Sequence, residues 1–433
     1  MTDAPVRRLG TKVAPAPPGV RVVLDARPLQ TPERAPLTAT YLDALLRAYD
    51  SEPVVGESFA IFLRSDLDDP TKRYPHLEVV GRRLLPPTRL LRSAAMTVDP
   101  FLLRGATLGA AWRAERGGAA GAVYHAVGGG SLPIAPGLPV VVTLLDLAPW
   151  EMPGSFQGSL AGRFGQRLRA QQLRDASAVI VGSKAAARAA RHLLRLHEDR
   201  IRIVPLAPRP AFAATAGQRR IRPETIALRE RLGLAERYLV FSGRFDARQD
   251  LGTLLKALAA LAAAGRPAGL DPAVPWPPRV LLVGASPDDR ASLARAAARE
   301  GIGETLAYAP ALAPDALAGL VRAARAVILP VLSEGTGLPV IEAIASGTPI
   351  VATATGPIPE LVGPAGLLVG PGEPDRLAVA LTTIWADDAV HQRLVTAARA
   401  RAKATRRSWA DVARDTRSVY AEVGVKRPRS TVA

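Results

Sequence analysis

The chain lacks cysteine, has few aromatic residues and contains no long apolar run. None of its 433 residues is cysteine and 5% are aromatic, so disulfides and metal sites built on thiolates are excluded. No apolar run approaches the ~20 residues that span a bilayer. Residues 1–5 do not begin a signal peptide, because no apolar segment follows basic residues there. We therefore expect a cytoplasmic protein, whose length corresponds to about two or three domains.

Lysine is scarce as well, and the basic excess is almost entirely arginine. Six lysines accompany fifty arginines in a chain with a formal net charge of +17. A nucleic-acid-binding surface would concentrate basic residues and interleave them with aromatic ones. These arginines are spread along the whole chain, so we expect no nucleic-acid partner. An anionic membrane surface and anionic substrates both fit the charge.

Short apolar segments of strand length alternate with helical segments through both halves of the chain. This alternation is typical of parallel α/β sheets. It predicts two doubly wound, Rossmann-like domains that face a central cleft, where binding is expected. The predicted divisions are a disordered N-terminal segment (1–19), an N-terminal domain (20–207), a linker (208–236), a C-terminal domain (237–405) and a C-terminal helix with a tail (406–433).

The most informative segment carries Glu334 and Glu342 around the turn Gly335-Thr336-Gly337. A buried strand is predicted before it, at 326–330, and an apolar helix after it, at 340–346. Such a turn exposes backbone N–H groups at a helix N-terminus, where an anionic phosphate is favoured. The glutamates would repel that phosphate but can accept hydrogen bonds from hydroxyls. The turn therefore indicates a ligand that combines phosphate with polyol.

A second candidate site lies at 242–250, after the first predicted strand of the C-terminal half. The first strand-to-helix turn is a common phosphate position in such sheets. Arg244 and Arg248 have the spacing and chemistry to clamp a diphosphate in bidentate fashion. The alternative interpretation is two surface arginines in an arginine-rich chain.

Together these motifs resemble the donor-binding half of the family-4 glycosyltransferases, which have the GT-B fold. The resemblance covers most of residues 237–400. Beyond the two glutamates and Gly243-Arg244, the segments 345–353, 356–363 and 365–369 carry it. It implies an acceptor-side N-terminal domain, a nucleotide-sugar-binding C-terminal domain and a C-terminal helix that packs back on the first domain.

The resemblance also implies roles for the residues of the first motif. The residue matching Glu342 binds the ribose hydroxyls of the donor. The residue matching Glu334 lies near the hydroxyls of the transferred sugar. Backbone amides around Gly337 and Leu338 meet the donor phosphates.

In the same family an arginine in the place of Arg244 and a lysine five positions later hold the diphosphate. Here the later position is Gln249, which keeps a hydrogen-bond donor but loses the charge. Either the neighbouring Arg248 compensates, or donor binding is weaker or shifted. Arg244 and Arg248 would then stabilise the charge of the departing diphosphate.

The first half resembles the family more loosely. The family's opening loop carries glycines that approach the donor phosphate, whereas residues 33–40 contain none, and a Cβ at each position limits such an approach. The family's strand that ends in His-Asp matches 140–147, where Leu145 precedes Asp146; leucine neither hydrogen-bonds nor titrates. Asp146 either orients acceptor or sugar hydroxyls or is a strand-end turn residue. His125 either occupies the vacated space or is a structural residue at its strand end.

Two further segments give weaker signals. Asp66-Leu67-Asp68 has a metal-binding pattern, but Asp69-Pro70 follows, and a polar turn explains it better. We expect no metal, and no cofactor besides the donor. The segment 82–92 mixes basic and apolar residues, and either contacts an anionic membrane or is a partly buried strand and loop.

The resemblance implies a retaining, metal-independent glycosyltransferase that moves a hexose from a nucleotide diphosphate sugar to a saccharide or lipid-linked acceptor, in polysaccharide biosynthesis. Its expected catalytic residues are Glu334, Arg244 and Asp146. The expected location is cytoplasmic, with peripheral contact at the inner face of the membrane left open. The alternative is a non-catalytic GT-B relic that binds a nucleotide sugar or scaffolds a biosynthetic complex. An epimerase or phosphorylase on the same fold is a third possibility.

Overall fold

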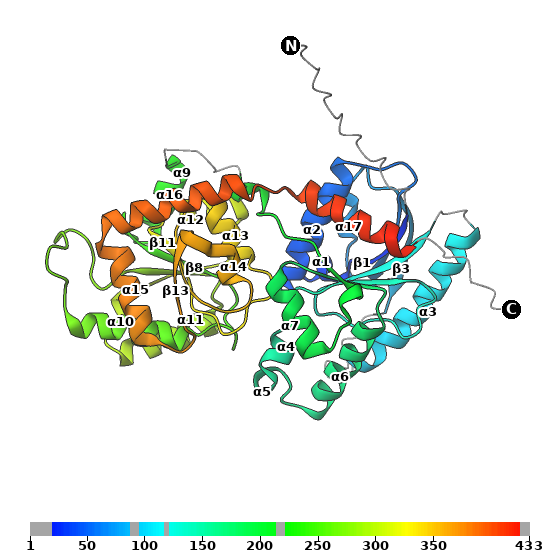
Figure 1. Cartoon of the computed structure of the whole chain (residues 1–433), viewed down its shortest axis with the longest axis horizontal. Coiled ribbons are helices and arrows are strands. Elements are labelled where there is room, and N and C mark those ends of the chain that lie inside the picture. The colour runs from blue at the N-terminus through cyan, green and yellow to red at the C-terminus, as the bar shows by residue number, and fades with distance from the viewer. Residues whose placement is uncertain (1–19, 87–94, 117–120, 214–220, 425–433) are drawn as a thin grey trace, which may run out of the picture.

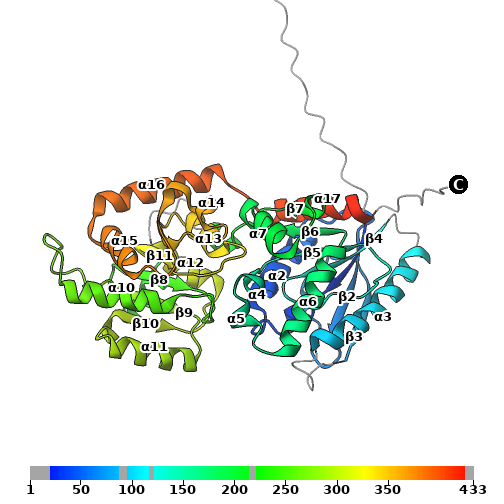
Figure 2. The same cartoon turned by 60° about the horizontal axis from the view of Figure 1, so that its bottom comes forward.

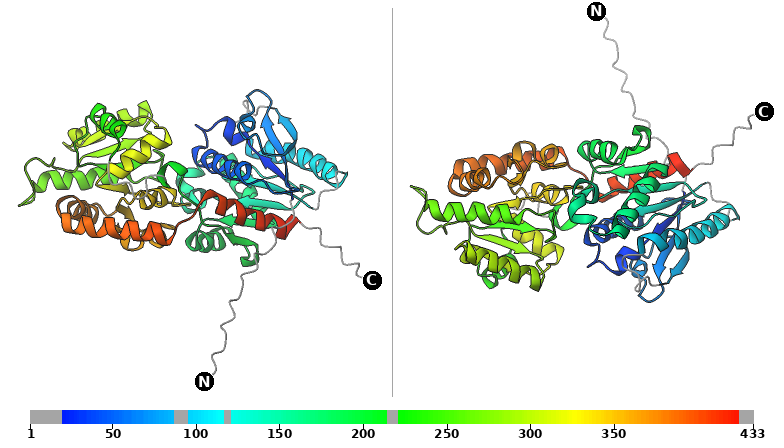
Figure 3. Two further views of the ribbon diagram at one scale, coloured as in Figure 1. Left: turned by 90° about the horizontal axis from the view of Figure 1, so that it is seen from above. Right: turned by 90° about the horizontal axis from the view of Figure 1, so that it is seen from below.

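The computed structural model describes residues 20–86, 95–116, 121–213 and 221–424, and it forms two α/β domains side by side (Figure 1). Each domain contains one parallel sheet with helices on both faces, as the alternation in the sequence predicts. The predicted disordered segment, 1–19, lies outside the described residues. The chain crosses between the domains twice, after β7 and again between α16 and α17 (Figures 2 and 3).

The N-terminal domain is built on a seven-stranded sheet of order β3-β2-β1-β4-β5-β6-β7. Its strands are β1 (Arg21–Asp25), β2 (Ser58–Arg64), β3 (Val79–Leu85), β4 (Ala122–Val127), β5 (Val140–Thr143), β6 (Ala178–Val181) and β7 (Ile201–Ile203). Central strands read as continuous apolar runs because parallel sheets are buried on both faces. In β1, Val22 and Leu24 face one core while Val23 faces the other, as strand periodicity requires.

Helices cover both faces of this sheet. On one face lie α2 (Pro36–Ser51) and the last helix, α17 (Trp409–Gly424); on the other lie α3 (Ala95–Arg116), α6 (Leu160–Asp175) and α7 (Lys184–Leu194). The shorter helices are α1 (Arg27–Gln30), α4 (Ala148–Glu151), α5 (Pro153–Phe156), η1 (Pro70–Arg73) and η2 (Glu198–Arg200). Figure 1 shows α17 beside α2. The ring of Trp409 on α17 lies edge-on to that of Tyr41 on α2, with 5.4 Å between the ring centroids. The C-terminal helix therefore completes the core of the first domain.

The C-terminal domain has a six-stranded sheet of order β10-β9-β8-β11-β12-β13. Its strands are β8 (Leu239–Ser242), β9 (Val280–Val283), β10 (Leu306–Ala309), β11 (Ala326–Leu329), β12 (Ile350–Thr353) and β13 (Gly366–Val369). Its helices are α10 (Leu251–Ala264), α11 (Pro287–Arg299), η3 (Gly303–Thr305), α12 (Pro314–Ala323), α13 (Leu338–Ala345), α14 (Ile358–Val362), η4 (Gly363–Ala365), α15 (Pro374–Ala386) and α16 (Asp388–Ala404). The strand order reverses between β8 and β11, and ligands bind at such switch points in open α/β sheets.

The segment predicted as a linker contains two helices, α8 (Pro210–Ala213) and α9 (Pro223–Arg231). Phe212 of α8 is 1% exposed and belongs to the core of the C-terminal domain. Part of this segment is therefore packed structure of the second domain.

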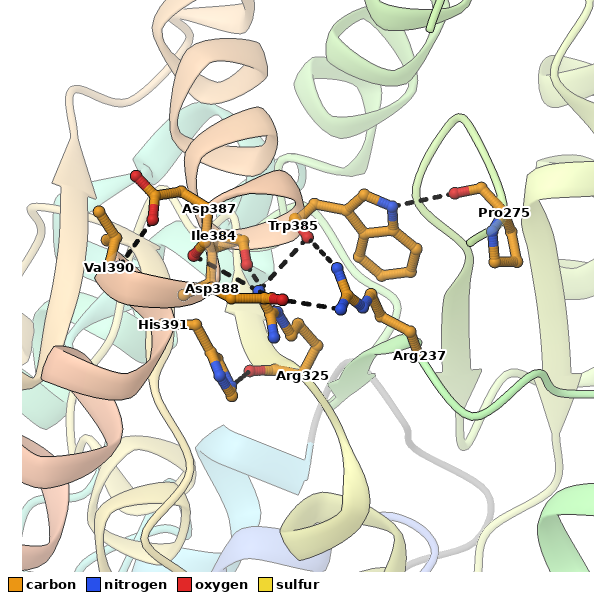
Figure 4. A network of polar contacts seen from close by, with 9 residues as sticks. All are labelled: Arg237, Pro275, Arg325, Ile384, Trp385, Asp387, Asp388, Val390 and His391. Carbon is orange, nitrogen blue, oxygen red and sulfur yellow. Dashed lines mark hydrogen bonds and ion pairs between the residues drawn. The ribbon is translucent and has the colours of Figure 1, made fainter. Parts of the chain in front are cut away.

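A polar network holds the amino-terminal ends of the central strands of the C-terminal domain, opposite to the strand ends that carry the switch-point loops. Figure 4 shows this network. Arg237, just before β8, donates to the Trp385 carbonyl at 2.7 Å and to Asp388 at 3.2 Å. Arg325, just before β11, donates to the Ile384 carbonyl at 2.8 Å and to the same aspartate at 2.5 Å. These bonds tie the α15–α16 junction to the two central strands.

Candidate active site

The two loops that carry the predicted motifs run side by side at the carboxyl ends of β8 and β11. Asp250 N donates to the Pro330 carbonyl at 2.6 Å, and Leu332 N donates to the Arg248 carbonyl at 2.7 Å. Gln249 forms an antiparallel bridge with Val331 between these two bonds. The fold therefore brings the arginine-bearing loop and the glutamate-bearing loop together at the switch point.

The turn between β11 and α13 is shaped by glycine. Gly337 precedes the helix with φ +67°, a left-handed conformation that favours glycine. A Cβ built on this residue would lie 2.1 Å from Leu361 Cδ1. The backbone can therefore start the helix directly after the turn only with glycine at this position.

The side chain of Glu334 folds back onto this turn. Its Oε1 accepts hydrogen bonds from Thr336 N at 2.9 Å, from Gly337 N at 2.8 Å and from Thr336 Oγ1 at 3.0 Å. Successive backbone N–H groups of this kind form a concavity that binds anions. The anion in this structure is the Glu334 carboxylate, so a donor phosphate that uses these two amides would have to displace it.

Glu342 lies one turn into α13, with a side chain that is 7% exposed. Arg209, in the chain segment before α8, forms a bidentate ion pair with this carboxylate. Its Nε lies 2.5 Å from Oε1, and its NH2 nitrogen lies 2.9 Å from Oε2. Burial raises the pKa of Glu342 while the Arg209 guanidinium opposes that rise. The predicted ribose-binding carboxylate is thus buried, hydrogen-bonded and paired. No motif in the sequence pointed to Arg209, which lies in the segment predicted as a linker.

Arg244 and Arg248 have different surroundings. Arg244 is half exposed, with Nε 3.3 Å from Asp246. Arg248 is 12% exposed and binds Asp246, with Nε 3.0 Å from Oδ1, as well as Asp146 of the other domain at 2.6 Å. Its guanidinium also lies over the ring of Phe156, 5.6 Å from the centroid. Arg244 is therefore the more accessible cation, and Arg248 already bridges the domains.

Gln249, in the family's lysine position, is held by its backbone bridge to Val331. Its Oε1 is buried and accepts no hydrogen bond from the described part of the chain. A buried, unpaired amide oxygen is unfavourable, so this side chain has an unused acceptor beside the arginine loop.

The N-terminal domain contributes the strand-end residues after β5. Asp146 uses both carboxylate oxygens, accepting from Ala148 N at 2.9 Å and from Arg248 at 2.6 Å. Ser333, next to the key glutamate, donates to Glu151 of α4 across the domains. Burial, together with the charges of Asp146 and Glu334, raises the pKa of Glu151. Asp146 is thus a turn residue and an interdomain contact at once, and Glu151 is an interdomain residue that the sequence analysis missed.

His125 lies in the core of the N-terminal domain. It is 0% exposed, with Nε2 2.8 Å from Thr143 Oγ1 and Nδ1 2.6 Å from the Tyr420 hydroxyl of α17. Burial lowers its pKa to about 3. Of the two interpretations left open, the geometry favours the structural one, because both ring nitrogens are used inside the core.

The weaker sequence signals lie in the N-terminal domain, after β2 and on β3. Asp66 is paired with Arg64, and Asp69 caps η1 and pairs with Arg82. In the described ranges, no group of three or more His, Asp or Glu residues could hold a metal ion. Residues 87–92 of the basic and apolar segment lie outside the described residues. No helix among those that the structure describes is long and apolar enough to cross a membrane.

Comparisons with known proteins agree with this architecture. Residues 236–387 match the family model described as "Glycosyl transferases group 1". The chain is 31% identical over 307 residues to a D-inositol 3-phosphate glycosyltransferase of Xylanimonas cellulosilytica, covering 67% of this chain and 68% of the relative. It is 35% identical over 205 residues to the same-named protein of Streptomyces griseus, of which it spans 41%. It is 39% identical over 123 residues to an MMP alpha-(1->4)-mannosyltransferase of Mycolicibacterium hassiacum, of which it spans 30%.

Solved structures resemble the whole two-domain architecture. The sucrose-phosphate synthase of Thermosynechococcus elongatus superposes with a TM-score of 0.68 at 20% identity, covering 93% of this chain and 98% of that one. HepE of Anabaena in complex with UDP-glucose gives 0.65 at 17% identity, covering 93% and 99%. Such identities establish the fold alone, while the longer sequence match establishes the family. The chain therefore belongs to the group 1 glycosyl transferases and has the two-domain GT-B fold.

Proposed function

We propose that the protein transfers a hexose from a nucleotide diphosphate sugar to a hydroxyl of a saccharide or lipid-linked acceptor, with retention of configuration and without a metal ion. One observation carries the proposal: the loops bearing Arg244 and Glu334 are joined at the switch point and face the other domain, and Glu342 follows on α13. This is where the fold positions ligands. Their residues match those that bind the donor in family-4 enzymes.

In this proposal each side chain of the C-terminal domain has a separate task. Glu342 accepts the ribose hydroxyls, and Arg244 binds the diphosphate and stabilises the charge on the leaving group. The turn amides of Gly337 and Leu338 contribute the anion site. Glu334 gives up its hydrogen bond from Gly337 N, which the phosphate then accepts, and binds hydroxyls of the transferred sugar.

The N-terminal domain would contribute the acceptor side. Asp146 orients an acceptor or sugar hydroxyl, and the donor phosphate takes the acceptor proton, so that Leu145 in place of a histidine does not end the reaction. Contacts between the domains exclude water around the reacting centre. Arg248 is the residue whose proposed role changes most: its bonds to two carboxylates suit it to hold the cleft closed around the diphosphate.

The direct test is turnover with a panel of nucleotide diphosphate sugars and saccharide acceptors, with UDP-glucose and GDP-mannose in the first round. A product with the anomeric configuration of the donor, formed equally well with chelator present and lost in Glu334→Ala, is the expected result. Saturable donor binding without transfer or slow hydrolysis would instead favour the non-catalytic relic. A product formed without acceptor, or only with free phosphate, would identify an epimerase or a phosphorylase.

We further propose a cytoplasmic location with peripheral contact at an anionic membrane, through the outer faces of α3 and α6. These helices both pack on residues 132–137: Ile134 N donates to the Pro100 carbonyl at 3.3 Å, and Gln172 donates to the Leu132 carbonyl at 2.7 Å. Figures 1 and 2 show the two helices on the same side of the domain.

The exposed residues of these two faces combine large apolar side chains with arginine. Phe101 is 61% exposed and Leu108 43% on α3, while Leu160 is 79% exposed and Phe164 59% on α6. The exposed arginines of the same faces are Arg104, Arg163 and Arg167. Apolar tips with basic neighbours suit an anionic interface. Vesicles with 30% anionic lipid should sediment the wild type but not Phe101→Ser/Phe164→Ser, with Val379→Ser as the exposed control on the other domain.

A further inference from the structure

Arg209 occupies the first crossing between the domains, where it is fixed from three directions. Its guanidinium makes the bidentate pair with Glu342 and lies over the ring of Phe212, 4.9 Å from the centroid. The neighbouring Pro208 carbonyl accepts a hydrogen bond from Trp409 Nε1 at 3.1 Å. The arginine is 22% exposed and therefore lies at the surface of the site, whereas the glutamate is 7% exposed. This arrangement restricts both the backbone and the head group of Arg209.

The pair leaves hydrogen-bonding capacity on the carboxylate. An ionised carboxylate offers about four lone-pair positions, and the two N–H groups of Arg209 occupy one on each oxygen. Within the described residues, every hydrogen bond to this carboxylate comes from Arg209. The backbone N–H of Arg209 is a further donor to the same carboxylate, so about one acceptor position stays available beyond Arg209. The vicinal hydroxyls O2′ and O3′ of a ribose present two neighbouring donors that can share this remaining capacity.

We propose that Arg209 is a positioning residue that holds the Glu342 carboxylate in the orientation that accepts both ribose hydroxyls, and so makes the site selective for ribonucleotides over deoxyribonucleotides. The proposal rests on the proposed function, in which Glu342 meets the donor ribose. A fixed carboxylate loses little conformational freedom when the nucleotide binds, and preorganisation of this kind increases affinity. Selectivity follows because a nucleotide that lacks one hydroxyl leaves remaining acceptor capacity of this buried carboxylate unfilled.

Arg209 also favours the ionised form of Glu342. Burial raises the pKa of this carboxyl and the guanidinium lowers it again. Without the arginine the carboxyl would take up a proton at higher pH. A protonated carboxyl has fewer acceptor positions, so nucleotide binding by such a variant would weaken as the pH falls.

The Arg209–Glu342 pair also has the opposite interpretation, in which Arg209 blocks nucleotide binding, and the experiment distinguishes the two. If the guanidinium plugs the glutamate and must be displaced by ribose, its removal would strengthen nucleotide binding. If the guanidinium positions the glutamate, its removal would weaken binding and reduce the preference for ribose. The direction of the change therefore decides between them.

The experiment is calorimetric titration with the nucleoside diphosphate that binds the wild type best, alongside its 2′-deoxy and 3′-deoxy analogues, at pH 6 and pH 8. The proteins are the wild type, Arg209→Gln, Arg209→Lys and Glu342→Gln. Arg222→Gln, an exposed position of the same segment, is the matched control. Thermal melting of each variant shows whether it is folded.

We expect the wild type to prefer the ribonucleotide by about 10- to 100-fold over each analogue, since one hydrogen bond to a charged group is at stake. Arg209→Gln should reduce that ratio to below about threefold and bind more weakly at pH 6 than at pH 8, and Arg209→Lys should restore part of the ratio. Tighter binding, or an unchanged ratio and pH profile, in a folded Arg209→Gln variant would overturn the positioning role alone. A wild type that binds no nucleotide would overturn the proposed function and this inference together.

Discussion

The backbone of Leu145 lies against Gly335 so closely that no side chain fits between them. A Cβ built on Gly335 would lie 2.3 Å from the Leu145 carbonyl oxygen. One residue follows a strand of the N-terminal domain, and the other belongs to the glutamate turn of the C-terminal domain. The domains therefore meet through backbone at the point where the proposed chemistry takes place, and glycine is what permits the contact.

Gly335→Ala should lower activity far more than stability. The obstacle is backbone on both sides, so the domains must separate to admit a methyl group, while each core stays intact. A misplacement of about 1 Å can cost ~100-fold in rate, and we expect a loss of that order in kcat/KM. Steady-state kinetics and thermal melting measure the two effects.

Gly252→Ala is the matched control, because no atom lies within 4 Å of a Cβ built at this position of α10. It should keep wild-type activity. Equal losses in both variants, or wild-type activity in Gly335→Ala, would show that the close contact does not matter for turnover.

Asp146→Asn should loosen the contact between the domains. The change removes the charge that pairs with Arg248 at 2.6 Å, and a hydrogen bond between charged groups contributes ~1.5–3 kcal/mol. The radius of gyration from small-angle X-ray scattering should rise while the secondary structure is unchanged. Asp199→Asn changes an exposed carboxylate of the same domain and should leave the scattering curve as it is. A curve for Asp146→Asn that matches the wild type would argue against this latch.

Arg417→Met should destabilise the N-terminal domain through the C-terminal helix. Arg417 on α17 forms a buried bidentate pair with Glu57, both bonds at 2.9 Å or less. Removing one partner of such a pair costs about 3–5 kcal/mol, because the other charge stays buried and unpaired. Denaturant unfolding measures the loss. Arg414→Met, on the exposed side of the same helix, is the control and should change the free energy of unfolding by less than about 0.5 kcal/mol. A similar effect of both variants would refute the stabilising role of the Arg417–Glu57 pair.

His125 should make stability fall as the solution becomes acidic. Burial lowers its pKa from 6.5 to about 3, so between these pH values the unfolded chain holds a proton that the folded protein does not. Between pH 6.5 and about pH 3, His125 therefore lowers the free energy of unfolding by about 1.4 kcal/mol for each unit by which the pH falls. Above pH 6.5 the residue contributes no slope.

The measurement is urea unfolding of the wild type and His125→Gln between pH 4 and pH 8. Glutamine can still hydrogen-bond to Thr143 and Tyr420 but does not titrate in this range. His391, whose pKa is lowered to about 4 by burial and neighbouring charges, is present in both proteins and cancels in the difference. Parallel curves over the whole range would contradict the buried, neutral histidine.

The fold and the main features of the site could be predicted from the sequence because their signals are local. Alternating strands and helices indicate the parallel sheets, and the Gly-Thr-Gly turn must follow a strand and precede a helix. The two loops then had to lie together once the strand order was known. The family resemblance supplied the rest of the donor half.

What the sequence did not predict depends on partners from distant segments. No sequence motif marks Arg209, because it meets its partner, Glu342, only where the folded chain crosses between the domains. Arg248 was predicted to bind the diphosphate, yet it binds Asp246 and Asp146; the aspartate two positions earlier was the local clue. His125 was ambiguous because the helix that buries it, α17, comes from the end of the chain.

The most direct test of this account is calorimetric titration of the wild type and Glu342→Ala with a panel of nucleotides and nucleotide sugars. The account predicts saturable binding that prefers one nucleotide diphosphate sugar and is lost, or weakened at least about 100-fold, in the variant. Binding of the same ligand with equal affinity by both proteins would contradict the site. Absence of binding by the wild type across the whole panel would contradict the proposed function.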